Sequence, residues 1–590
     1  MTVVLSSPLR QPPVLESDQK LSPLIVGVSG HRDIHPSCVA HAKTEVTDFL
    51  AALRALAPHT PIRVMVGMAE GADILVAEAA LVLELPVDAV LPMPLEDYAQ
   101  DFDGESLARL QHLLENPGVH TVVLTPPVGT EHDRDALYEN LTETLIRKTN
   151  LLIALWDGEY SALRGGTGDT VLKYLEAHVG SATGEPITFI AEKDDIPWGQ
   201  QAIFWVVVSR RSLPPKACET PRYLSGVGEH VLLIESRMPA DLETQIIDLD
   251  RYNAEFLRLS DAGRLGMLDT LMGSLPGGIS AEERANLQTI DAEYGKADAL
   301  AVYCQHHSHR LFRWFSYMAS AMGLLFLMYA KLIPNKTFLI AYLVVLLAGL
   351  GLFQFTKSRH WFSKHLAYRV LAETMRTMFF LRLTAADRRV SAEDLIELAG
   401  IDQFTGFSWI TNVLKNVDPV TDLAAQDQTQ QERNLEIVRK TWIEGQQSYF
   451  RAKVAQLERT HHRLELLKNG LLAALALITI ILVVFSHDLG TLLFEAGFSA
   501  KDFLMFLMGL LPVWLGIWEI YQGKMATREL LWQYRNLLSH FSRAKIQLSQ
   551  ANDPDRRMTI LADLGRDSLM ESYLWTIHRY HREHEPPAAG

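Results

Sequence analysis

The sequence has few cysteines, and this scarcity limits the kinds of site that it can form. Only three occur in 590 residues, Cys38, Cys218 and Cys304, and their spacings match neither a zinc site nor a disulfide framework. The first 20 residues also lack the basic start and apolar core of a cleavable secretory signal. The cysteine pattern fits a reducing compartment, and without a cleavable signal we expect the first span to serve as the insertion signal.

Positive charge is scarce as well. The chain has 55 Lys and Arg against 70 Asp and Glu, which gives a formal net charge of −15. A general nucleic-acid binder needs clustered Lys and Arg to contact phosphates. We therefore expect no nucleic-acid partner.

Long hydrophobic runs are missing from the first half of the chain, whereas the second half has four. None of the four contains a charged residue, and they cover Trp314–Ala330, Thr337–Thr356, Asn469–Ser486 and Phe503–Trp518. A helix needs about 17 to 25 residues to cross a bilayer, so the second and third runs qualify and the other two are borderline. A buried or re-entrant helix is the alternative for the borderline pair. Because short turns join the runs in pairs, we predict two helical hairpins.

Basic residues near these runs predict the orientation in the membrane. Within 20 residues of the outer ends of the two hairpins there are 16 Lys and Arg, against 3 in the two short turns. Since cytoplasmic segments are enriched in Lys and Arg, both termini and the middle segment should lie in the cytoplasm. The expected location is the inner (cytoplasmic) membrane, with four crossings.

Short apolar runs alternate with helical patterns between Leu24 and Ile234. The runs are Leu24–Val28, Arg63–Val66, Val87–Leu91, Thr121–Leu124, Leu151–Leu155, Ile187–Ala191, Ile203–Val208 and Val231–Ile234. Strands separated by helices of 10 to 20 residues predict a Rossmann-like, doubly wound and mostly parallel sheet. Ligands of such sheets bind at the carboxyl ends of the strands.

Glycine and polar residues concentrate where three of these runs end. The candidate ligand-binding residues are Gly30, His31 and Arg32 after the first run, Gly67, Glu70, Gly71 and Asp73 after the second, and Trp156, Asp157, Gly165, Gly166, Thr167, Gly168 and Asp169 after the fifth. Glycines let the backbone approach an anion, and a helix starting at Thr170 would direct N–H groups at it. Arg32 could clamp a phosphate, while Asp73, Asp157 or Asp169 could accept hydrogen bonds from ribose hydroxyls.

Each element has a simpler interpretation when it is taken alone. A glycine loop is more often a tight turn, a single Arg more often a surface charge, and Trp156 more often a core residue than a platform for a base. Three such loops at the carboxyl ends of parallel strands are harder to explain as turns. The sequence therefore predicts a nucleotide-like ligand.

Four runs of residues carry a family resemblance. They are VGVSGHRDI, VMVGMAEGADILVAEAA, VLPMPLEDYAQDF and LIALWDGEYSALRGGTGDT. Together they resemble the SLOG superfamily of Rossmann-like domains, which includes the cytokinin-activating LOG enzymes and nucleotide-sensing domains of bacterial conflict systems. The same region is also similar to the ligand domain of melastatin-type transient receptor potential channels. The resemblance covers about residues 24–234. It implies binding of a nucleotide-derived signal, such as an ADP-ribose-like molecule or a cyclic nucleotide.

The same resemblance leaves catalysis in doubt. Catalytic members carry a PGGxGTxxE motif whose Glu takes part in cleaving an N-glycosidic bond. Here Arg164 replaces the Pro, Asp169 replaces the Thr, and Leu172 stands at the Glu position. This departure disfavours hydrolysis and leaves binding intact, so we expect no catalytic residue.

The membrane half has the pattern of a duplication. Ser308-His309-Arg310-Leu311 precedes the first hairpin as His461-His462-Arg463-Leu464 precedes the second, and Tyr368-Arg369 follows the first as Tyr534-Arg535 follows the second. The order of elements resembles the SLATT family, two-span modules that accompany SLOG domains and are inferred to form pores. One chain would then supply two modules.

Two long helices should enter the membrane from the cytoplasm. Ser280 and Glu283 form a capping box at the start of one that runs to about Phe312 and beyond, and a second runs from about Gln430 through the third span. Such helices could act as levers or only as spacers. Because the spans carry no deep ionisable residue, a pore would need an oligomer and a hydrophobic constriction. Small residues such as Gly323 and Gly509 would let helices approach closely.

Histidines near the spans do not complete a metal site. No cysteine or carboxylate joins them in a ligand set, so we expect no bound metal at His306, His307, His309, His461 and His462.

These observations define an expected organisation and function. The segments are a disordered tail at 1–20, a SLOG-like domain at 21–260, a linker at 261–280, a first membrane module at 281–400 with spans at about 314–333 and 337–356, a connector at 401–429, and a second module at 430–590 with spans at about 469–486 and 503–520. The leading hypothesis is a receptor and effector that forms a homo-oligomeric pore, with antiviral defence implied by the resemblance. The alternatives are a membrane-tethered nucleotide hydrolase with Glu70, Asp157 or Asp169 as general base, and a membrane scaffold.

Overall fold

The computed structural model describes most of residues 21–583. The residues outside its description are 1–20, 128, 131, 160–164, 176–186, 192–200, 213–218, 229–230, 267, 276–278, 358, 387–406, 418–427, 492–497 and 584–590. The predicted tail at 1–20 therefore lies outside the described residues. The chain forms two compact units, which we name the sheet unit (Met1–Arg264 and Gly400–Ala425) and the helical unit (Leu265–Ala399 and Gln426–Gly590).

The sheet unit contains a nine-stranded mixed sheet in the order β4-β3-β2-β1-β5-β7-β8-β9-β6. Its strands are β1 (Leu24–Gly30), β2 (Ile62–Val66), β3 (Val87–Leu91), β4 (Val119–Val123), β5 (Leu151–Trp156), β6 (Thr188–Ala191), β7 (Ile203–Val207), β8 (Arg222–Gly228) and β9 (Val231–Glu235). Neighbours are parallel from β4 through β7 and between β6 and β9, whereas β8 is antiparallel to both of its neighbours. The prediction of a mostly parallel α/β sheet is confirmed.

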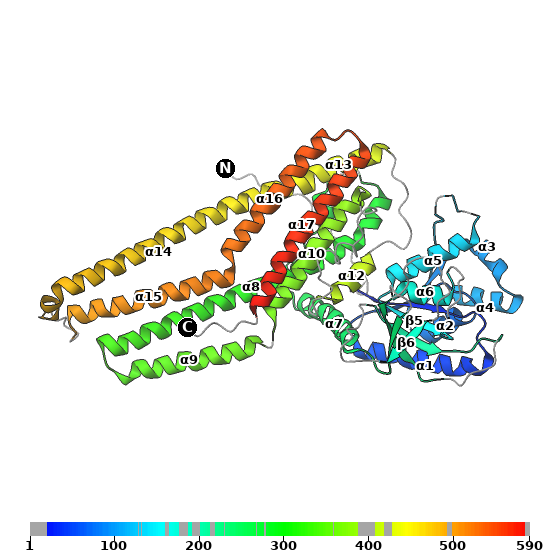
Figure 1. Cartoon of the computed structure of the whole chain (residues 1–590), viewed down its shortest axis with the longest axis horizontal. Helices are drawn as coiled ribbons and strands as arrows, with labels where there is room; N and C mark the ends of the chain where they lie inside the picture. Colours follow the sequence, from blue (N-terminus) through cyan, green and yellow to red (C-terminus); the bar gives the residue numbers. More distant parts are fainter. Residues whose placement is uncertain are drawn as a thin grey trace. The chain divides into compact units, whose positions relative to one another are not determined.

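Helices cover both faces of the parallel part of the sheet (Figure 1). They are α1 (Pro36–Leu56), α2 (Ala72–Val82), α3 (Leu95–Tyr98), α4 (Gly104–Leu114), α5 (Arg134–Lys148), α6 (Thr167–Tyr174) and α7 (Ala240–Asp261). Helices α1 and α2 pack together on one face, and α5 and α6 pack together on the other. Every residue of the central strand β5 is buried, as expected for a strand covered on both sides.

Strand β8 has no counterpart among the predicted strands, because its sequence is rich in polar residues and glycine. Gly226 lies where the carbonyl of Leu175, at the end of α6, approaches the strand: a Cβ atom there would stand 2.1 Å from that oxygen. The register also shifts between Gly226 and Gly228. The glycines that hide the strand from sequence patterns are thus required by its packing.

One short helix of the sheet unit comes from the expected connector. Helix α12 (Trp409–Val417) lies within the segment 401–429, and it packs against α5 and α7 of the sheet unit. No pattern in the sequence predicted this attachment.

The helical unit contains eight further described α-helices. They are α8 (Ala281–Leu327), α9 (Lys336–Lys357), α10 (Trp361–Leu383), α13 (Gln428–Val438), α14 (Gly445–Thr491), α15 (Ala500–Met525), α16 (Thr527–Gln550) and α17 (Pro554–Glu583). Four helical stretches among the described residues are long and apolar enough to cross a membrane: Glu283–Leu332, Lys336–Leu383, Gln428–Phe485 and Ala500–Gln550. Each contains one of the four predicted spans.

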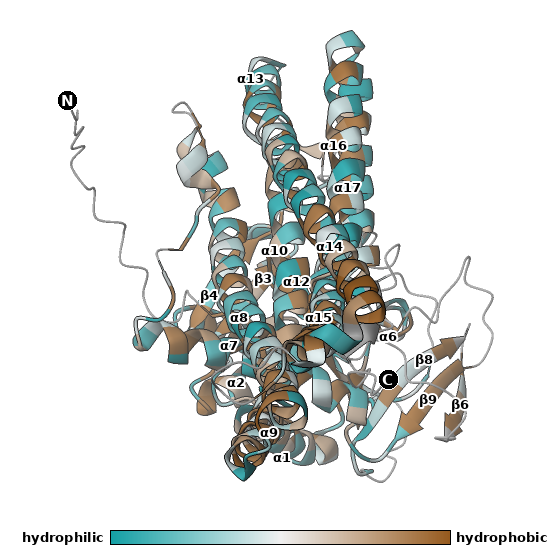
Figure 2. Ribbon diagram, turned by 90° about the vertical axis from the view of Figure 1, so that its left-hand side faces the viewer, coloured by the Kyte–Doolittle hydropathy of each residue, from teal (hydrophilic) through white to brown (hydrophobic). Residues whose placement is uncertain are grey.

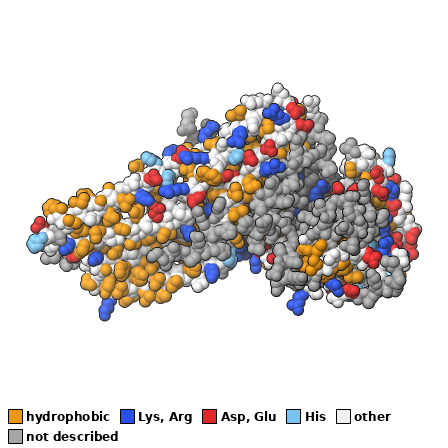
Figure 3. All heavy atoms as spheres, in the orientation of Figure 1, with side chains coloured by type: hydrophobic (Ala, Val, Ile, Leu, Met, Phe, Trp, Pro, Cys, Tyr) orange, Lys and Arg blue, Asp and Glu red, His pale blue; other side chains and the backbone are white. Residues whose placement is uncertain are grey.

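The apolar parts of these helices are turned outward. In α9, Ile340, Val344 and Leu347 are more than half exposed, and the helix has no buried residue. Figure 2 shows the apolar stretch of α9, and Figure 3 shows hydrophobic side chains gathered over the hairpins. Such a surface is unfavourable in water and suits a hydrocarbon environment.

The two long helices have the predicted extents. The Ser280–Glu283 capping box opens α8, which continues for 47 residues into the first hairpin. The second long helix runs from α13 through a π-helical segment, Arg439–Glu444, into α14, which has a non-helical residue at Phe485.

Glycines bring the two hairpins together through α8 and α15. A Cβ atom at Gly323 would lie 2.7 Å from Val513, and one at Gly509 would lie 3.0 Å from Leu327. The close approach of small residues therefore joins the hairpins inside the helical unit.

The two membrane modules share a left-handed backbone joint after the hairpin. His360 precedes α10 with φ 50° and ψ 34°, and Ala526 separates α15 from α16 with φ 51° and ψ 40°. Nine residues further on, Arg369 lies 3.1 Å from Asp298 of α8, and Arg535 lies 2.5 Å from Glu458 of α14. The modules thus use the same order of helix, hairpin, joint and ion-paired helix.

Candidate functional site

The strand order changes direction between β1 and β5, and we name the carboxyl ends of these two strands, with the loops that follow them, the crevice. From β1 the chain proceeds through β2, β3 and β4 to one side, while β5 and β7 lie on the other. Diverging crossovers leave a gap at such a switch point, and this gap is where open α/β sheets bind ligands. Two of the three predicted loops, those after β1 and β5, border it.

A histidine and a carboxylate meet across this crevice. The Nε2 atom of His31 lies 3.0 Å from Oδ1 of Asp157 and 3.2 Å from the amide nitrogen of Asp157. Nε2 either carries a proton for the carboxylate or a lone pair for the amide, so only one contact can be a hydrogen bond at a time. Burial acts to raise the pKa of Asp157, but hydrogen bonds from His31 and from the amide of Glu159 outweigh it and lower that pKa.

Arg32, which follows β1, places a positive charge beside Tyr138. Its side chain is exposed, and its guanidinium carbon lies 5.1 Å from the ring centroid of Tyr138 on α5. Within the described part of the chain no carboxylate lies within ion-pairing distance of Arg32. Tyr138 in turn donates a hydrogen bond to Asp101, which also pairs with Arg134 at 2.6 Å. A stacked but unneutralised guanidinium suits phosphate binding.

Tyr138 also stands beside the third loop. A Cβ atom at Gly165 would lie 3.5 Å from the backbone carbonyl of Tyr138, and Gly165 itself has φ +70°. The loops after β1 and β5 therefore both approach α5. No sequence motif pointed to Tyr138; its only signal was its helical spacing from the buried residue Leu141.

The glycines after β1 and β2 let the chain approach itself. The amide of Ala72 donates to the carbonyl of His31 at 3.1 Å. A Cβ atom at Gly71 would lie 2.3 Å from the carbonyl oxygen of Arg32, and Gly71 has φ +84°. One at Gly30 would lie 2.3 Å from the Cβ of Ala72. These two glycines fix the loops against each other, so their first role is packing.

The two other predicted carboxylates are engaged by their own loops. Asp73 is buried and accepts a hydrogen bond from the amide of Ala69 at 3.0 Å. Asp169 accepts one from the amide of Gly165 at 3.0 Å and pairs with Lys173 at 3.1 Å. Both hold glycine loops in place, whereas Asp157, which accepts from the amide of Glu159 in its own loop, also contacts His31 of the loop after β1.

Burial changes the pKa of Asp73. It raises the pKa of this carboxyl to about 7, against the opposing effects of the Ala69 amide and of Arg32. Above it, Tyr98 donates a hydrogen bond to the carbonyl of Gly67 at 3.0 Å. The first turn of α2 thus carries a carboxyl group whose pKa is near neutral pH.

The remaining predicted residues occupy positions of different kinds. Glu70 is half-buried in the loop before α2. Gly166 caps α6, which begins at Thr167, and Gly168 is buried in its first turn. Trp156 is fully buried and donates its indole N–H to the carbonyl of Glu159, so it is a core residue in this structure.

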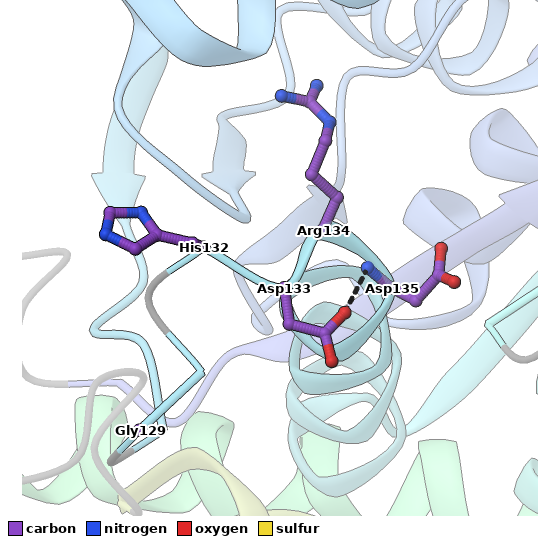
Figure 4. A pocket seen from close by; sticks show the side chains of 5 residues that line it. All are labelled: Gly129, His132, Asp133, Arg134 and Asp135. Carbon is purple, nitrogen blue, oxygen red and sulfur yellow. Dashed lines mark hydrogen bonds between the residues drawn. The ribbon is translucent and has the colours of Figure 1, made fainter.

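An open hollow of about 560 Å³ lies beside these loops, at the start of α5. It is lined by Gly129, His132, Asp133, Arg134 and Asp135, none of which the sequence singled out. Figure 4 shows Asp133 at the helix start, where it accepts from the amide of Asp135 at 3.2 Å, with the side chains of His132 and Arg134 directed apart. Through Asp101, Arg134 is connected to Tyr138 and so to the crevice.

Two further findings concern metal-binding groups and the position of Leu172. Among the described residues, no group of three or more His, Cys, Asp or Glu side chains is arranged to hold a metal ion. Leu172 is fully buried in α6. A carboxylate at this position would be inside the core.

Comparisons with models of protein families, with curated proteins and with solved structures gave no match. The function must therefore be inferred from the geometry and chemistry of this chain.

Proposed function

We propose that the protein is a membrane-embedded receptor that binds a nucleotide-derived molecule at the carboxyl edge of its sheet and controls a homo-oligomeric pore. The ligand is ADP-ribose-like or a cyclic nucleotide, and the biological role is antiviral defence, as the SLOG and SLATT resemblance implies. The protein resides in the inner membrane with both termini in the cytoplasm, in keeping with the distribution of Lys and Arg.

The observation that carries the sensing half is the composition of the crevice. An exposed arginine without an ion-paired carboxylate, a histidine and a carboxylate stand at the switch point of a parallel sheet. Arg32 supplies a permanent positive charge for phosphate, and Asp157, with its lowered pKa, supplies an ionised acceptor for ribose hydroxyls. His31 lies between the two and would change partner when a ligand enters.

The effector half is supported by the four apolar helices. Two of them continue as single helices well beyond the length that a bilayer requires. Such helices are stiff enough to carry a displacement into the membrane. To shift a pore from mostly closed to mostly open, the ligand must bind the open state more tightly by about 5.5 kcal/mol.

A binding experiment tests the sensing half. We expect one member of a panel of ADP-ribose, NAD, AMP and cyclic nucleotides to bind the purified full chain in calorimetry. Arg32→Met should weaken that binding about 10- to 100-fold, because a charge-assisted phosphate contact is lost. Arg251→Met, which removes an exposed arginine of α7, is the matched control. Absence of binding across the panel would refute the proposal in favour of a scaffold.

A flux experiment tests the effector half. The chain reconstituted in liposomes should release ions when the bound member of the panel is added and should retain them without it. Chromatography of the same mixtures distinguishes a receptor from a hydrolase: the receptor leaves the nucleotide intact. Turnover that disappears in Glu70→Gln would instead identify an enzyme.

A further inference from the structure

The first hairpin lies in a long stretch of the chain without negative charge. Between Asp298 and Glu373 the sequence contains no Asp or Glu, and this interval includes both spans of the hairpin. The two carboxylates at its limits have partners of their own: Asp298 lies 3.1 Å from Arg369, and Glu373 pairs with Arg369 and Arg376. Both are thus engaged in ion pairs of α8 and α10.

Four exposed cations lie at the outer ends of this hairpin. They are Arg310 and Arg313 on α8, Lys357 at the end of α9, and Arg359 just before α10. Of the described carboxylates, none lies within ion-pairing distance of these four side chains. Like charges without counterions repel one another, so an anion from outside the chain would be attracted to the four cations.

The second hairpin is neutralised at the corresponding positions. Lys468 directly precedes its first span and Glu519 directly follows its second, and these two side chains form an ion pair. The residues that directly border the spans of the first hairpin are Arg313 and Lys357, which are both positive. The general preference for Lys and Arg on one side of a membrane applies equally to both hairpins, so it does not account for this difference.

Aromatic rings adjoin the four cations where the spans begin. Trp314, one residue after Arg313, is 55% exposed, and its ring centroid lies 6.2 Å from that of Tyr317. The guanidinium carbon of Arg359 lies 5.1 Å from the ring centroid of Phe355. Exposed tryptophan and tyrosine are typical of the boundary between hydrocarbon and lipid headgroups. In a bilayer the four cations would therefore lie at the level of the lipid phosphates.

We propose that the outer ends of the first hairpin bind the phosphate groups of anionic phospholipids through the four cations. Basic clusters directly beside a membrane helix attract negatively charged lipids, with about a 5-fold gain in binding for each Lys or Arg. The second hairpin, whose bordering lysine and glutamate form a pair, should attract such lipids less. The proposal rests on the candidate spans lying in a bilayer, but not on a nucleotide ligand or a pore, so its failure is distinguishable from that of the proposed function.

Native mass spectrometry of the full chain tests the proposal. The purified protein is mixed in detergent with equal amounts of phosphatidylglycerol and phosphatidylcholine, and we expect it to retain at least about 10-fold more of the anionic lipid. The triple variant Arg310→Gln, Arg313→Gln, Arg359→Gln should bind phosphatidylglycerol about 100-fold more weakly, because three of the four charges are removed. All three side chains are exposed, so thermal unfolding should change little.

A matched variant of the second hairpin is the control. Arg463→Gln, Lys468→Gln, Arg528→Gln removes the same number of cations, two of which lie beside the carboxylates of Glu519 and Glu465. This variant should weaken the binding of phosphatidylglycerol by no more than about 5-fold. Equal losses in the two triple variants would refute a site at the first hairpin and would indicate only a general attraction by basic residues.

A charge-conserving variant supplies the last test. Arg310→Lys, Arg313→Lys, Arg359→Lys keeps every positive charge, so it should retain the preference for phosphatidylglycerol. Loss of the preference in this variant, or equal retention of both lipids by the unaltered chain, would overturn the proposal. Displacement of the lipid by an equal concentration of inorganic phosphate would also overturn it, because the cations would then hold a free anion and not a membrane lipid.

Discussion

The two edges of the parallel sheet use polar residues in opposite ways. At the amino edge, Asn253 and Asn150 are buried, and their hydrogen bonds all attach one part of the chain to another. At the carboxyl edge, Arg32 is exposed and His31 shares one nitrogen between two partners. The amino edge therefore uses its polar side chains to attach segments of the chain to one another. The carboxyl edge instead leaves Arg32 and His31 able to contact other groups.

The carboxyl edge also contains residues in the left-handed region of backbone conformation. Met68, after β2, is fully buried with φ 61°, and Gly71 has φ +84°. A side chain in the left-handed region costs about 1 to 3 kcal/mol, which the surrounding structure must offset. Strain at the carboxyl edge is what a binding site requires, since it holds loops in positions that local preferences would not give.

The largest expected loss of stability comes from a substitution at the carboxyl edge. Gly71→Ala should lower the free energy of unfolding of the sheet unit by about 3 to 5 kcal/mol, because its φ is strained for alanine and its Cβ would overlap the carbonyl of Arg32. Thermal unfolding of the detergent-solubilised chain measures the loss. Gly104→Ala, where a Cβ meets nothing within 4 Å, is the control. Equal stability of the two variants would contradict the tight approach of the loops.

The next largest loss of stability comes from a substitution at the amino edge. Asn253→Ala should cost about 2 to 4 kcal/mol, since it removes both buried hydrogen bonds between the Asn253 side chain and the backbone of Ser22. The same unfolding measurement applies. Arg251→Ala, two residues away and exposed, should change stability by less than about 0.5 kcal/mol. If Asn253→Ala proved equally mild, the amino edge would not be an attachment surface.

One substitution at the carboxyl edge should raise the free energy of unfolding instead of lowering it. The pKa of Asp73 is about 7 in the folded chain against an ordinary 3.8, so the folded state keeps a proton that the unfolded state has lost between these values. Its contribution to stability is therefore full below about pH 4 and is lost as the pH rises through 7. Asp73→Asn keeps an acceptor for the Ala69 amide and should stabilise the chain by about 1 to 3 kcal/mol at pH 8.

The pH series supplies the control for this prediction. The difference between Asp73→Asn and the unaltered chain should vanish towards pH 4, where both side chains are neutral. A constant difference across the series would mean that packing and not charge is responsible.

The smallest effect concerns Arg32. Because its side chain is exposed, Arg32→Met should change the free energy of unfolding by less than about 0.5 kcal/mol. The same variant is expected to lose ligand affinity strongly, so comparison of unfolding with calorimetry separates the two roles. A large loss of stability would place Arg32 with the attachment residues of the opposite edge.

Much of the fold could be predicted from patterns in the sequence. Alternating apolar runs located eight of the nine strands, and the four uncharged runs located the candidate membrane helices. Ser280 and Glu283 predicted the start of α8, because a capping box is a local interaction. Strand β8 was missed because Gly226 is needed for contact with α6, which is distant in sequence.

The candidate site could be predicted only in part. The loops after β1 and β5 meet where the sequence placed them, since parallel strands bring their carboxyl ends to one edge. The partners of Arg32 and Asp73 were not predictable, because Tyr138 comes from a helix without a motif and Asp73 bonds its own loop. Trp156 could be a core or a surface residue by sequence, and its neighbours in the fold decided for the core.

By itself the sequence determined the local features of this protein: the alternation of strands and helices, the glycine loops and the uncharged runs. These depend on residues close together in the chain, where periodicity and backbone preferences act directly. Only the tertiary structure decided that α12 belongs to the sheet unit, where the end of the helix is hydrogen-bonded to Lys148 and to the carbonyl of Pro23. Those features depend on contacts between residues more than 200 positions apart, which no local pattern encodes.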